Sequence, residues 1–407
     1  MKVTITPGKL SGTIQVPPSK SQAHRLIIGA ALADGTSRIH NLAHSQDICA
    51  TLDCMTQLGA VESQGGEIVT GIGRGRPSTG ILPTLDCGES GSTIRFLMPV
   101  ALAVAGGGVF RGRGRLMERP YKPYEDIFTR QNITFTRQPG QITLSGTLKP
   151  GRFELPGDVS SQFITGLLYV LPLLEGDSEL VLTTPLESRG YVELTLEALA
   201  QFGIVAHPTE TGWKVPGNQV GHPAEVTVEG DYSQASNYIV AASMGNPLTV
   251  TGLSTSSAQG DRIICDYARQ LDGTGTVTLS VRQCPDLVPA LAVRAALRAG
   301  ETTHIVDAAR LRLKESDRLE AVTAELNKLG AQVEQTPDAL IIHGVPHLHG
   351  GTCDSHGDHR IAMMLAVAAT CANGVVEVTG AESVAKSYPN FWEDYEALGG
   401  VIARTQV

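Results

Sequence analysis

The sequence has little of what several protein classes depend on. No Gly-x-Gly-x-x-Gly segment follows an expected strand and no Walker lysine loop occurs, so nucleotide chemistry lacks its usual signature. The seven cysteines form no Cys-x-x-Cys pair and no regular framework, which indicates free thiols in a reducing compartment. The formal net charge is −9, which argues against nucleic acid as the main partner.

Long hydrophobic runs and a targeting segment are also missing. The longest apolar run, residues 97–105, contains Pro99 and is too short to span a bilayer. The first six residues alternate like a strand and show no signal-peptide core. We therefore expect a cytoplasmic protein with no membrane partner. Its 407 residues, 42% of them apolar, are enough for two domains of about 200 residues.

The stretch 17–25 is the most informative part of the chain. Two prolines and a serine precede the apolar run 26–32, which predicts a strand-to-helix turn whose first backbone N–H groups attract anions. Lys20 lies in this turn, and Ser21 and Arg25 are four residues apart on one helix face. The pattern predicts a phosphate or carboxylate site, although an ordinary capped helix with solvated cations would have the same sequence.

The same design recurs along the chain. Counted from Pro18, the later copies begin after steps of 70, 69, 73, 55 and 72 residues, at Gly88, Gly157, Gly230, Pro285 and Gly357. In phase with them, four segments are typical of a helix C-cap followed by a strand: 58–61, 202–205, 329–333 and 398–401. We therefore predict six copies of one α/β unit, three in each domain, with a trimmed copy before Pro285. Each copy would point the polar N-terminus of a helix at a shared site.

Further candidates in the first half lie at these helix starts. Gly91 lets the backbone approach a ligand, and Arg119 lies in a basic, glycine-bearing loop that could equally be a solvated surface loop. Ser160, Ser161 and Gln162 offer neutral hydrogen-bonding groups suited to hydroxyls or phosphate oxygens. Ser188 follows at the next helix start, where it could simply cap.

In the second half, acidic and basic residues stand close together. Asp286 precedes an apolar helix and is as suitable for an N-cap as for a catalytic base. Lys314 and Arg318 are expected on one helix face, where they need a negative charge between them. Glu315 and Arg318 could also form an ordinary i,i+3 ion pair. Five histidines between residues 343 and 359 lack paired ligand spacing, so we expect no metal site there.

A set of short motifs occurs in a fixed order along the chain: Lys20-Ser21 with Arg25, Gly91 with Arg95, Arg119-Pro120, Ser160-Ser161-Gln162, Asp286, Lys314-Glu315 with Asp317-Arg318, Asp358-His359-Arg360 and Lys386. Taken together, these motifs resemble those of the 5-enolpyruvylshikimate-3-phosphate synthases, which are enolpyruvyl transferases. The resemblance covers nearly the whole chain. It departs at Glu89-Ser90, where many members have Asn-Ala before the glycine that corresponds to Gly91.

The resemblance implies an α/β (α+β) fold of two domains, each with three βαβαββ-type units, and an active site in the interdomain cleft. The domains would be residues 1–18 with 230–407, and residues 19–229. The implied reaction transfers the enolpyruvyl group of phosphoenolpyruvate to shikimate-3-phosphate without a metal or organic cofactor. The implied partners are these two substrates, and the protein would be a monomer.

The resemblance also implies roles for single residues. Asp286 would be the base and Glu315 the proton donor, with Lys20 and Lys386 stabilising charge and assisting proton transfer. Residues expected to hold shikimate-3-phosphate are Ser21, Arg25, Ser160, Ser161, Gln162, Ser188, Asp286 and Lys314. Residues expected to hold phosphoenolpyruvate are Lys20, Gly91, Arg119, Gln162, Arg318, Arg360 and Lys386.

Two other functions compete with this one. The sister enolpyruvyl transferase that acts on UDP-N-acetylglucosamine typically has Lys-Asn in place of Lys20-Ser21 and a reactive loop cysteine, where this chain has only Cys87. A non-catalytic anion-binding protein of the same fold should have lost one or more of Lys20, Asp286, Glu315 and Lys386. All four are present.

Overall fold

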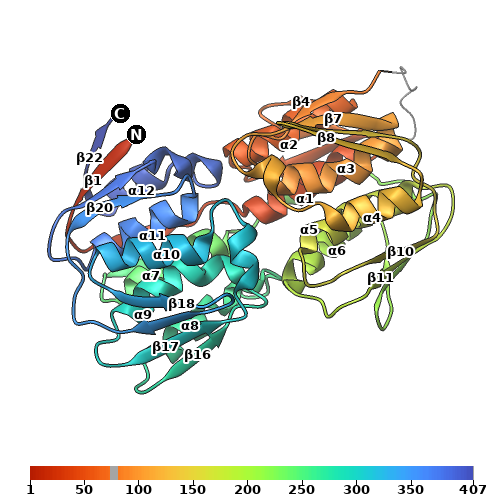
Figure 1. Ribbon diagram of the computed structural model, residues 1–407. Helices are drawn as coiled ribbons and strands as arrows, with labels where there is room; N and C mark the ends of the chain where they lie inside the picture. The colour runs from red at the N-terminus through yellow and green to blue at the C-terminus, as the bar shows by residue number, and fades with distance from the viewer. Residues whose placement is uncertain (74–80, 407) are drawn as a thin grey trace. The chain divides into compact units, whose positions relative to one another are not determined.

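The computed structural model describes residues 1–73 and 81–406, which divide into two compact units (Figure 1). Unit 1 comprises Met1–Pro17 and Gly230–Val407, and unit 2 comprises Pro18–Glu229. Each unit has its own hydrophobic core, made by the apolar faces of its sheets and helices. Among the described residues, no helix is both long enough and apolar enough to cross a membrane.

Unit 2 contains three four-stranded sheets, with strand orders β14-β3-β5-β4, β6-β7-β9-β8 and β10-β11-β13-β12. In each sheet the first two strands are parallel and the others antiparallel. The strands are β3 (Thr36–His40), β4 (Val61–Ser63), β5 (Ile68–Thr70), β6 (Thr84–Asp86), β7 (Gly107–Arg111), β8 (Thr134–Gln138), β9 (Gln141–Ser145), β10 (Arg152–Leu155), β11 (Ser178–Leu182), β12 (His207–Pro208), β13 (Gly212–Val215) and β14 (Glu225–Thr227).

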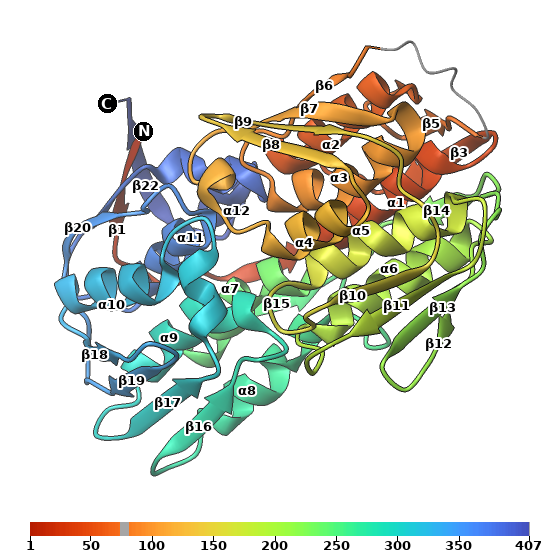
Figure 2. The same cartoon turned by 45° about the vertical axis from the view of Figure 1, so that its right-hand side comes forward.

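The helices of unit 2 pack between these sheets. Figure 2 shows β6–β9 and β10–β13 on the outside of the unit, with α3, α5 and α6 between them. Serine side chains cap α1, α2, α3 and α5 by accepting a backbone N–H of the first turn. The helices are α1 (Lys20–Leu32), α2 (Gln46–Leu58), α3 (Gly91–Ala105), α4 (Lys122–Arg130), α5 (Ser161–Val170) and α6 (Arg189–Gln201).

Unit 1 repeats the plan with two four-stranded sheets, β20-β21-β1-β22 and β16-β17-β19-β18, and one two-stranded sheet, β15-β2. Again the first pair in each four-stranded sheet is parallel. The strands are β1 (Lys2–Thr6), β2 (Gly12–Gln15), β15 (Leu248–Thr251), β16 (Val277–Ser280), β17 (Thr302–Val306), β18 (Gln332–Gln335), β19 (Leu340–His343), β20 (Gly351–Asp354), β21 (Val376–Thr379) and β22 (Val401–Thr405).

Helices α7, α9 and α11 form the centre of unit 1, and every residue of α11 is buried. Short 3₁₀ helices, labelled η, precede or replace some α-helical starts. The helical segments used below are α7 (Tyr232–Ser243), η3 (Gly260–Ile263), α8 (Ile264–Gln270), η4 (Pro285–Leu287), α9 (Val288–Ala296), η5 (Ala309–Leu313), α10 (Arg318–Lys328), α11 (His359–Ala369), η6 (Ala381–Lys386) and α12 (Phe391–Ala397).

The six sheets found within residues 1–73 and 81–406 confirm the predicted six-fold repeat, with three copies in each unit. Each predicted start leads directly into a helix, namely α1, α3, α5, α7, η4 with α9, and α11. The trimmed copy is also confirmed, because residues 230–285 contribute β15 to the two-stranded sheet. Three of the four predicted cap segments run straight into a strand, whereas the strand after 202–205 begins only at His207.

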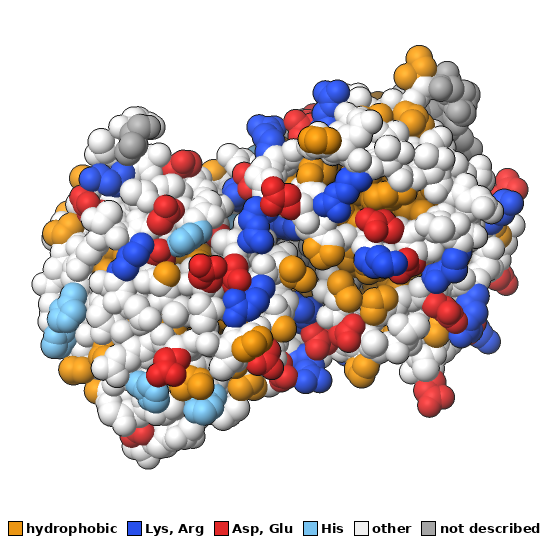
Figure 3. Space-filling model, in the orientation of Figure 1, with side chains coloured by type: hydrophobic (Ala, Val, Ile, Leu, Met, Phe, Trp, Pro, Cys, Tyr) orange, Lys and Arg blue, Asp and Glu red, His pale blue; other side chains and the backbone are white. Residues whose placement is uncertain are grey.

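The face of the protein in Figure 3 carries acidic and basic side chains interspersed over both units. This distribution agrees with the net charge of −9 and differs from the continuous basic surface that nucleic-acid backbones require.

Candidate active site

The N-termini of α1, α2 and α3 meet in unit 2. The ammonium of Lys20 lies 2.6 Å from Asp47 Oδ2, and both side chains are largely buried. The hydroxyl of Thr93 in α3 lies 3.5 Å from the backbone oxygen of Asp47 and 2.7 Å from the hydroxyl of Thr51. Because helix N-termini carry partial positive charge, this end of unit 2 favours anions.

A second set of polar groups joins α3 to α5 at the same ends. Gln162 Oε1 accepts a hydrogen bond from Arg95 Nη1 over 2.7 Å, and Gln162 Nε2 donates to Ser92 Oγ over 3.0 Å. A Cβ atom on Gly91 would lie 2.7 Å from Arg119 Nη1 and 3.5 Å from Gln162 Oε1. The glycine therefore leaves room for a guanidinium, and the structure brings Gly91, Arg119 and Gln162 together.

Arg25 is held by neutral groups. Its Nε donates to Thr195 Oγ1 at 2.8 Å, Nη1 to Ser21 O at 2.5 Å, and Nη2 to Tyr191 O at 2.8 Å. The side chain is 2% exposed, and burial lowers its pKa to about 10. A buried guanidinium bound by hydroxyls and carbonyls keeps its full charge available for an anion.

Besides Ser21, whose backbone oxygen accepts from Arg25, the prediction names three serines that occupy different positions. Ser160 caps α5 by accepting the backbone N–H of Gln162, and Ser161 begins that helix. Ser188 precedes α6 in the left-handed conformation, at φ +55°, and its hydroxyl does not cap the helix. Left-handed backbone is uncommon at a non-glycine residue, and such residues are enriched at functional sites.

In unit 1, Asp286 is surrounded by three cations. Its Oδ1 accepts from Arg318 Nη1 at 2.8 Å and from Lys314 Nζ at 3.3 Å, and its Oδ2 accepts from Arg360 Nη2 at 3.1 Å. Burial alone would raise the pKa of Asp286, but Arg360, Lys314 and Arg318 hold it well below the ordinary value. The carboxylate is therefore ionised over the physiological range.

Arg318 links three carboxylates. Its Nη2 lies 2.6 Å from Glu315 Oε2, its Nε lies 2.8 Å from Asp358 Oδ2, and Nη1 reaches Asp286. Burial would lower the pKa of Arg318, but Asp358, Glu315 and Asp286 together raise it above its ordinary value. The expectation that Lys314 and Arg318 share a helix face is wrong, because Lys314 follows η5 and Arg318 begins α10. Asp286 is nevertheless the negative charge required between them.

Lys386 ends η6 and is 8% exposed. Its ammonium donates to the backbone oxygen of Gly357 over 2.6 Å, directly before the start of α11. Arg360 lies in the first turn of α11, so the segment 357–360 contacts both Lys386 and Asp286.

Sequence reasoning missed two important carboxylates. Asp47, the partner of Lys20, follows the capping Ser45 and has the sequence of an ordinary acidic first turn. Asp358 was part of a recognised motif, but its role as N-cap of α11 and partner of Arg318 could not be read from spacing. Asp358 follows the predicted start at Gly357, so a search for acidic residues at the predicted starts would have singled it out, whereas Asp47 lies at none of them.

The histidines between residues 343 and 359 do not form a metal centre. Throughout the described part of the chain, no group of three histidine, cysteine, aspartate or glutamate side chains is placed to hold a metal ion. The rings of His347 and His349 contact each other, and His356 lies 2.7 Å from Glu325.

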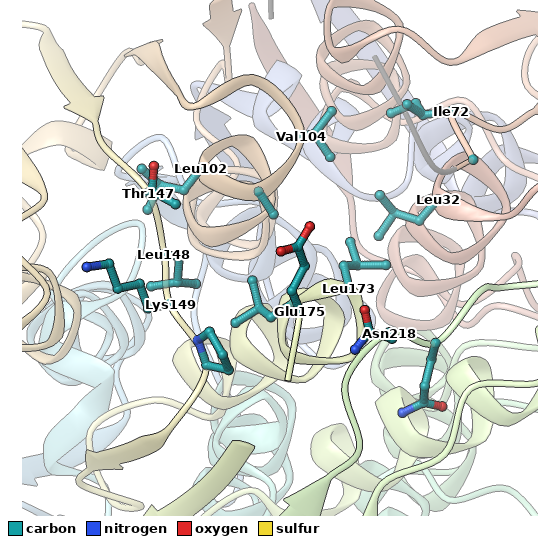
Figure 4. Close-up of a pocket in the computed structure, with 15 residues that line it drawn as sticks. Leu32, Ile72, Leu102, Val104, Thr147, Leu148, Lys149, Leu173, Glu175 and Asn218 are labelled. Carbon is teal, nitrogen blue, oxygen red and sulfur yellow. The ribbon is translucent and has the colours of Figure 1, made fainter. Parts of the chain in front are cut away.

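The opposite end of the unit 2 helices has a different character. A pocket there is lined by Leu32 of α1, Leu102 and Val104 of α3, Leu173, Lys149 and Glu175, among other residues (Figure 4). The length of α1 separates this pocket from Lys20 by about 20 Å. The pocket therefore lies away from the cations described above.

Comparisons with known proteins found relatives and solved structures that match nearly the whole chain. Relatives named 3-phosphoshikimate 1-carboxyvinyltransferase are 43% identical in Clostridium kluyveri and 44% identical in Clostridium perfringens, each over 98% of this chain and 98–99% of the relative. The fold matches an EPSP synthase structure from Acinetobacter baumannii, with a TM-score of 0.79 at 24% identity over 99% of this chain and all of the other. It also matches the enolpyruvyl transferase NikO from Streptomyces tendae, with a TM-score of 0.77 at 18% identity over 100% and 99% of the two chains. Residues 5–395 match the family described as EPSP synthase (3-phosphoshikimate 1-carboxyvinyltransferase), and the chain belongs to that family.

Proposed function

We propose that this protein transfers the enolpyruvyl group of phosphoenolpyruvate to the 5-hydroxyl of shikimate-3-phosphate and releases phosphate. The observation that carries the proposal is the Asp286 cluster, in which one ionised carboxylate is held by Lys314 and by two arginines in the first turns of α10 and α11. Both substrates are multiply anionic, so cations serve binding, while the carboxylate supplies the acid–base chemistry. The family membership of the chain supports the same reaction.

The residues proposed to bind the substrates lie near helix N-termini in both units. In unit 2, we assign the phosphate and hydroxyls of shikimate-3-phosphate to Ser21, Arg25, Ser160, Ser161, Gln162 and Ser188, and in unit 1 to Asp286 and Lys314. We assign phosphoenolpyruvate to Lys20, Gly91, Arg119 and Gln162 of unit 2 and to Arg318, Arg360 and Lys386 of unit 1. Arg25 supports the first assignment, because its charge is buried among neutral partners.

The proposed reaction has two steps. In the first, the 5-hydroxyl oxygen bonds to C2 of phosphoenolpyruvate and loses its proton to a base, while an acid protonates the C3 methylene to a methyl group. In the second, the C2–O bond to phosphate breaks and the phosphate takes the proton held by the base, while the methyl group returns a proton to the donor of the first step, which restores the double bond. Each step needs one proton donor and one proton acceptor, and no electron carrier takes part.

Asp286 is the proposed base. In the structure its pKa is depressed, and a strongly depressed carboxylate is a weak base. When the anionic substrates bind, they share Lys314, Arg318 and Arg360 with Asp286. The pKa of Asp286 then rises toward a useful value, so substrate binding itself activates the base.

Glu315 is the proposed proton donor, with Lys20 and Lys386 stabilising charge and assisting proton transfer. Its 2.6 Å contact with Arg318 favours the ionised carboxylate. Donation therefore requires that phosphoenolpyruvate draws Arg318 away from Glu315. Lys20 is restrained in a similar way by Asp47.

We further propose that units 1 and 2 are the two domains of the enzyme, which acts as a cytoplasmic monomer without a metal ion. The decisive experiment is a phosphate-release assay with shikimate-3-phosphate and phosphoenolpyruvate in the presence of a chelator. UDP-N-acetylglucosamine serves as the alternative acceptor. With phosphoenolpyruvate present throughout, phosphate release with shikimate-3-phosphate but not with UDP-N-acetylglucosamine supports the proposal. Phosphate release only with UDP-N-acetylglucosamine, or with neither acceptor, contradicts it.

A further inference from the structure

The turn that leads into α11 has an unusual backbone. The N–H of Asp358 donates to the oxygen of Ser355 over 2.8 Å, and the two residues between them are left-handed, with φ +54° at His356 and φ +64° at Gly357. Two successive positive φ values are typical of a type I′ turn, whose first central residue is normally Asn, Asp or Gly. A histidine there needs support from its surroundings.

Glu325 of α10 supplies that support. Its side chain is 1% exposed, and its Oε1 lies 2.7 Å from His356 Nε2 while Oε2 accepts the N–H of Asp354 over 3.0 Å. Lys328 Nζ lies 2.9 Å from both oxygens. Burial would raise the pKa of Glu325, but Lys328, the Asp354 N–H and His356 lower it. One buried, ionised carboxylate therefore holds the residue before the turn and its first central residue, His356.

The turn at residues 355–358 also holds η6 in place. The backbone oxygen of Gly357 accepts the ammonium of Lys386 over 2.6 Å. Ser355 Oγ donates to the oxygen of Gly380, the residue before η6, over 2.9 Å. Both ends of η6 are thus tied to the same four-residue turn, and the position of Lys386 depends on where the Gly357 carbonyl points.

We propose that His356 is a positioning residue for Lys386: by binding Glu325, it fixes the left-handed turn whose Gly357 carbonyl orients the Lys386 ammonium. This inference rests on the proposed role of Lys386 toward phosphoenolpyruvate. His356 itself contacts neither substrate. Its contribution passes through the backbone of the turn.

The test compares two replacements of His356 that separate the contact from the backbone conformation. In His356→Asn the left-handed conformation is tolerated, but the side chain is too short to reach Glu325. In His356→Gln the amide nitrogen takes the place of Nε2. The matched control is His347→Asn, at an exposed histidine outside the turn.

We expect kcat/KM for phosphoenolpyruvate to fall about tenfold in His356→Asn and to stay within about threefold of the parent in His356→Gln. The control should equal the parent. Equal activity of His356→Asn and the parent would overturn the proposal, as would equal losses in both His356 variants. If the parent protein itself showed no turnover of phosphoenolpyruvate and shikimate-3-phosphate, that result would instead contradict the proposed function.

A double-mutant cycle with Lys386→Met provides a readout independent of turnover. Phosphoenolpyruvate affinity is measured by calorimetry in the parent, in each single variant and in the double variant. If His356 acts through Lys386, His356→Asn will weaken binding by about tenfold in the parent and by less than about twofold in the Lys386→Met background. Equal effects in the two backgrounds would show that His356 does not act through Lys386.

Discussion

The guanidinium of Arg318 and the carboxylate of Asp358 form an ion pair that is almost completely removed from solvent. Nε and Oδ2 lie 2.8 Å apart, with side-chain exposures of 2% and 0%. Asp358 also caps α11 by accepting the N–H of Arg360 at 2.9 Å. One carboxylate therefore fixes the start of α11 and the first residue of α10, where the proposed site of unit 1 lies.

Replacing Asp358 with asparagine should separate these two duties, because asparagine retains the cap and removes the charge. We expect the free energy of unfolding to fall by about 3 kcal/mol, the lower end of the cost of breaking a buried pair, since Arg318 keeps two other carboxylates. Urea unfolding measures this change in the free energy of unfolding. Asp266→Asn, at an exposed pair with Arg269, should cost no more than about 1 kcal/mol. Equal losses in both variants would show that burial does not strengthen the Asp358 pair.

Replacing Asp286 with alanine should abolish turnover without abolishing binding. We expect kcat to fall about 10³-fold, because the proposed base is lost. Phosphoenolpyruvate should still bind, since Lys314, Arg318 and Arg360 lose a competing carboxylate and become more available to it. Steady-state kinetics and calorimetry give the two quantities. The exposed Asp266, paired with Arg269, provides the control Asp266→Ala. Turnover near the parent rate would rule out Asp286 as the base.

The repeat and the helix starts were predictable because they depend on local chemistry. Capping serines, glycine C-caps and apolar periodicity act within a few residues, and each predicted start from Pro18 to Gly357 precedes a helix. The six-fold count then follows from spacing alone. Local signals of this kind need no knowledge of which elements pack together.

The contacts of the proposed site were less predictable because they join distant segments. Lys20 and Asp47 are 27 residues apart, and Arg318 and Asp358 are 40 apart. The four-residue spacing of Lys314 and Arg318 predicts a single helix, but it does not distinguish a helix from a chain that leaves a 3₁₀ helix and enters an α-helix. The structure has the second arrangement. The common partner, Asp286, lies 28 residues before Lys314.

Gly91→Ala should weaken phosphoenolpyruvate binding with little loss of stability. The added methyl group would lie 2.7 Å from Arg119 Nη1, the far end of a flexible side chain, so the guanidinium moves and the helix does not. We expect KM for phosphoenolpyruvate to rise about tenfold while KM for shikimate-3-phosphate changes less than about threefold. Gly8→Ala serves as a control for stability, because an added Cβ there meets nothing within 4 Å and the backbone is not left-handed. Equal changes in both KM values would place Gly91 outside the phosphoenolpyruvate site.

The free energy of unfolding of unit 2 should decrease as the pH is lowered, because of His24. This side chain is fully buried, and its Nδ1 shares a hydrogen bond of 2.7 Å with Thr51 Oγ1. Burial first, and then the neighbouring Lys20 and Arg25, lower the pKa of His24 well below its ordinary value. A neutral His24 leaves the two cations, which we assign to substrate binding, without a third charge between them.

The sign of the effect follows from proton uptake. Below about pH 6.5 the imidazole is protonated in the unfolded chain but stays neutral in the folded protein, so the unfolded state binds more protons and stability falls as pH falls. The slope due to His24 approaches about 1.4 kcal/mol per pH unit below that pH. Urea unfolding between pH 7.5 and about pH 5 should show a smaller slope in His24→Asn than in the parent. The exposed His207 gives the control His207→Asn, which should keep the parental slope. A His24→Asn slope equal to the parental one would mean that His24 titrates alike in both states.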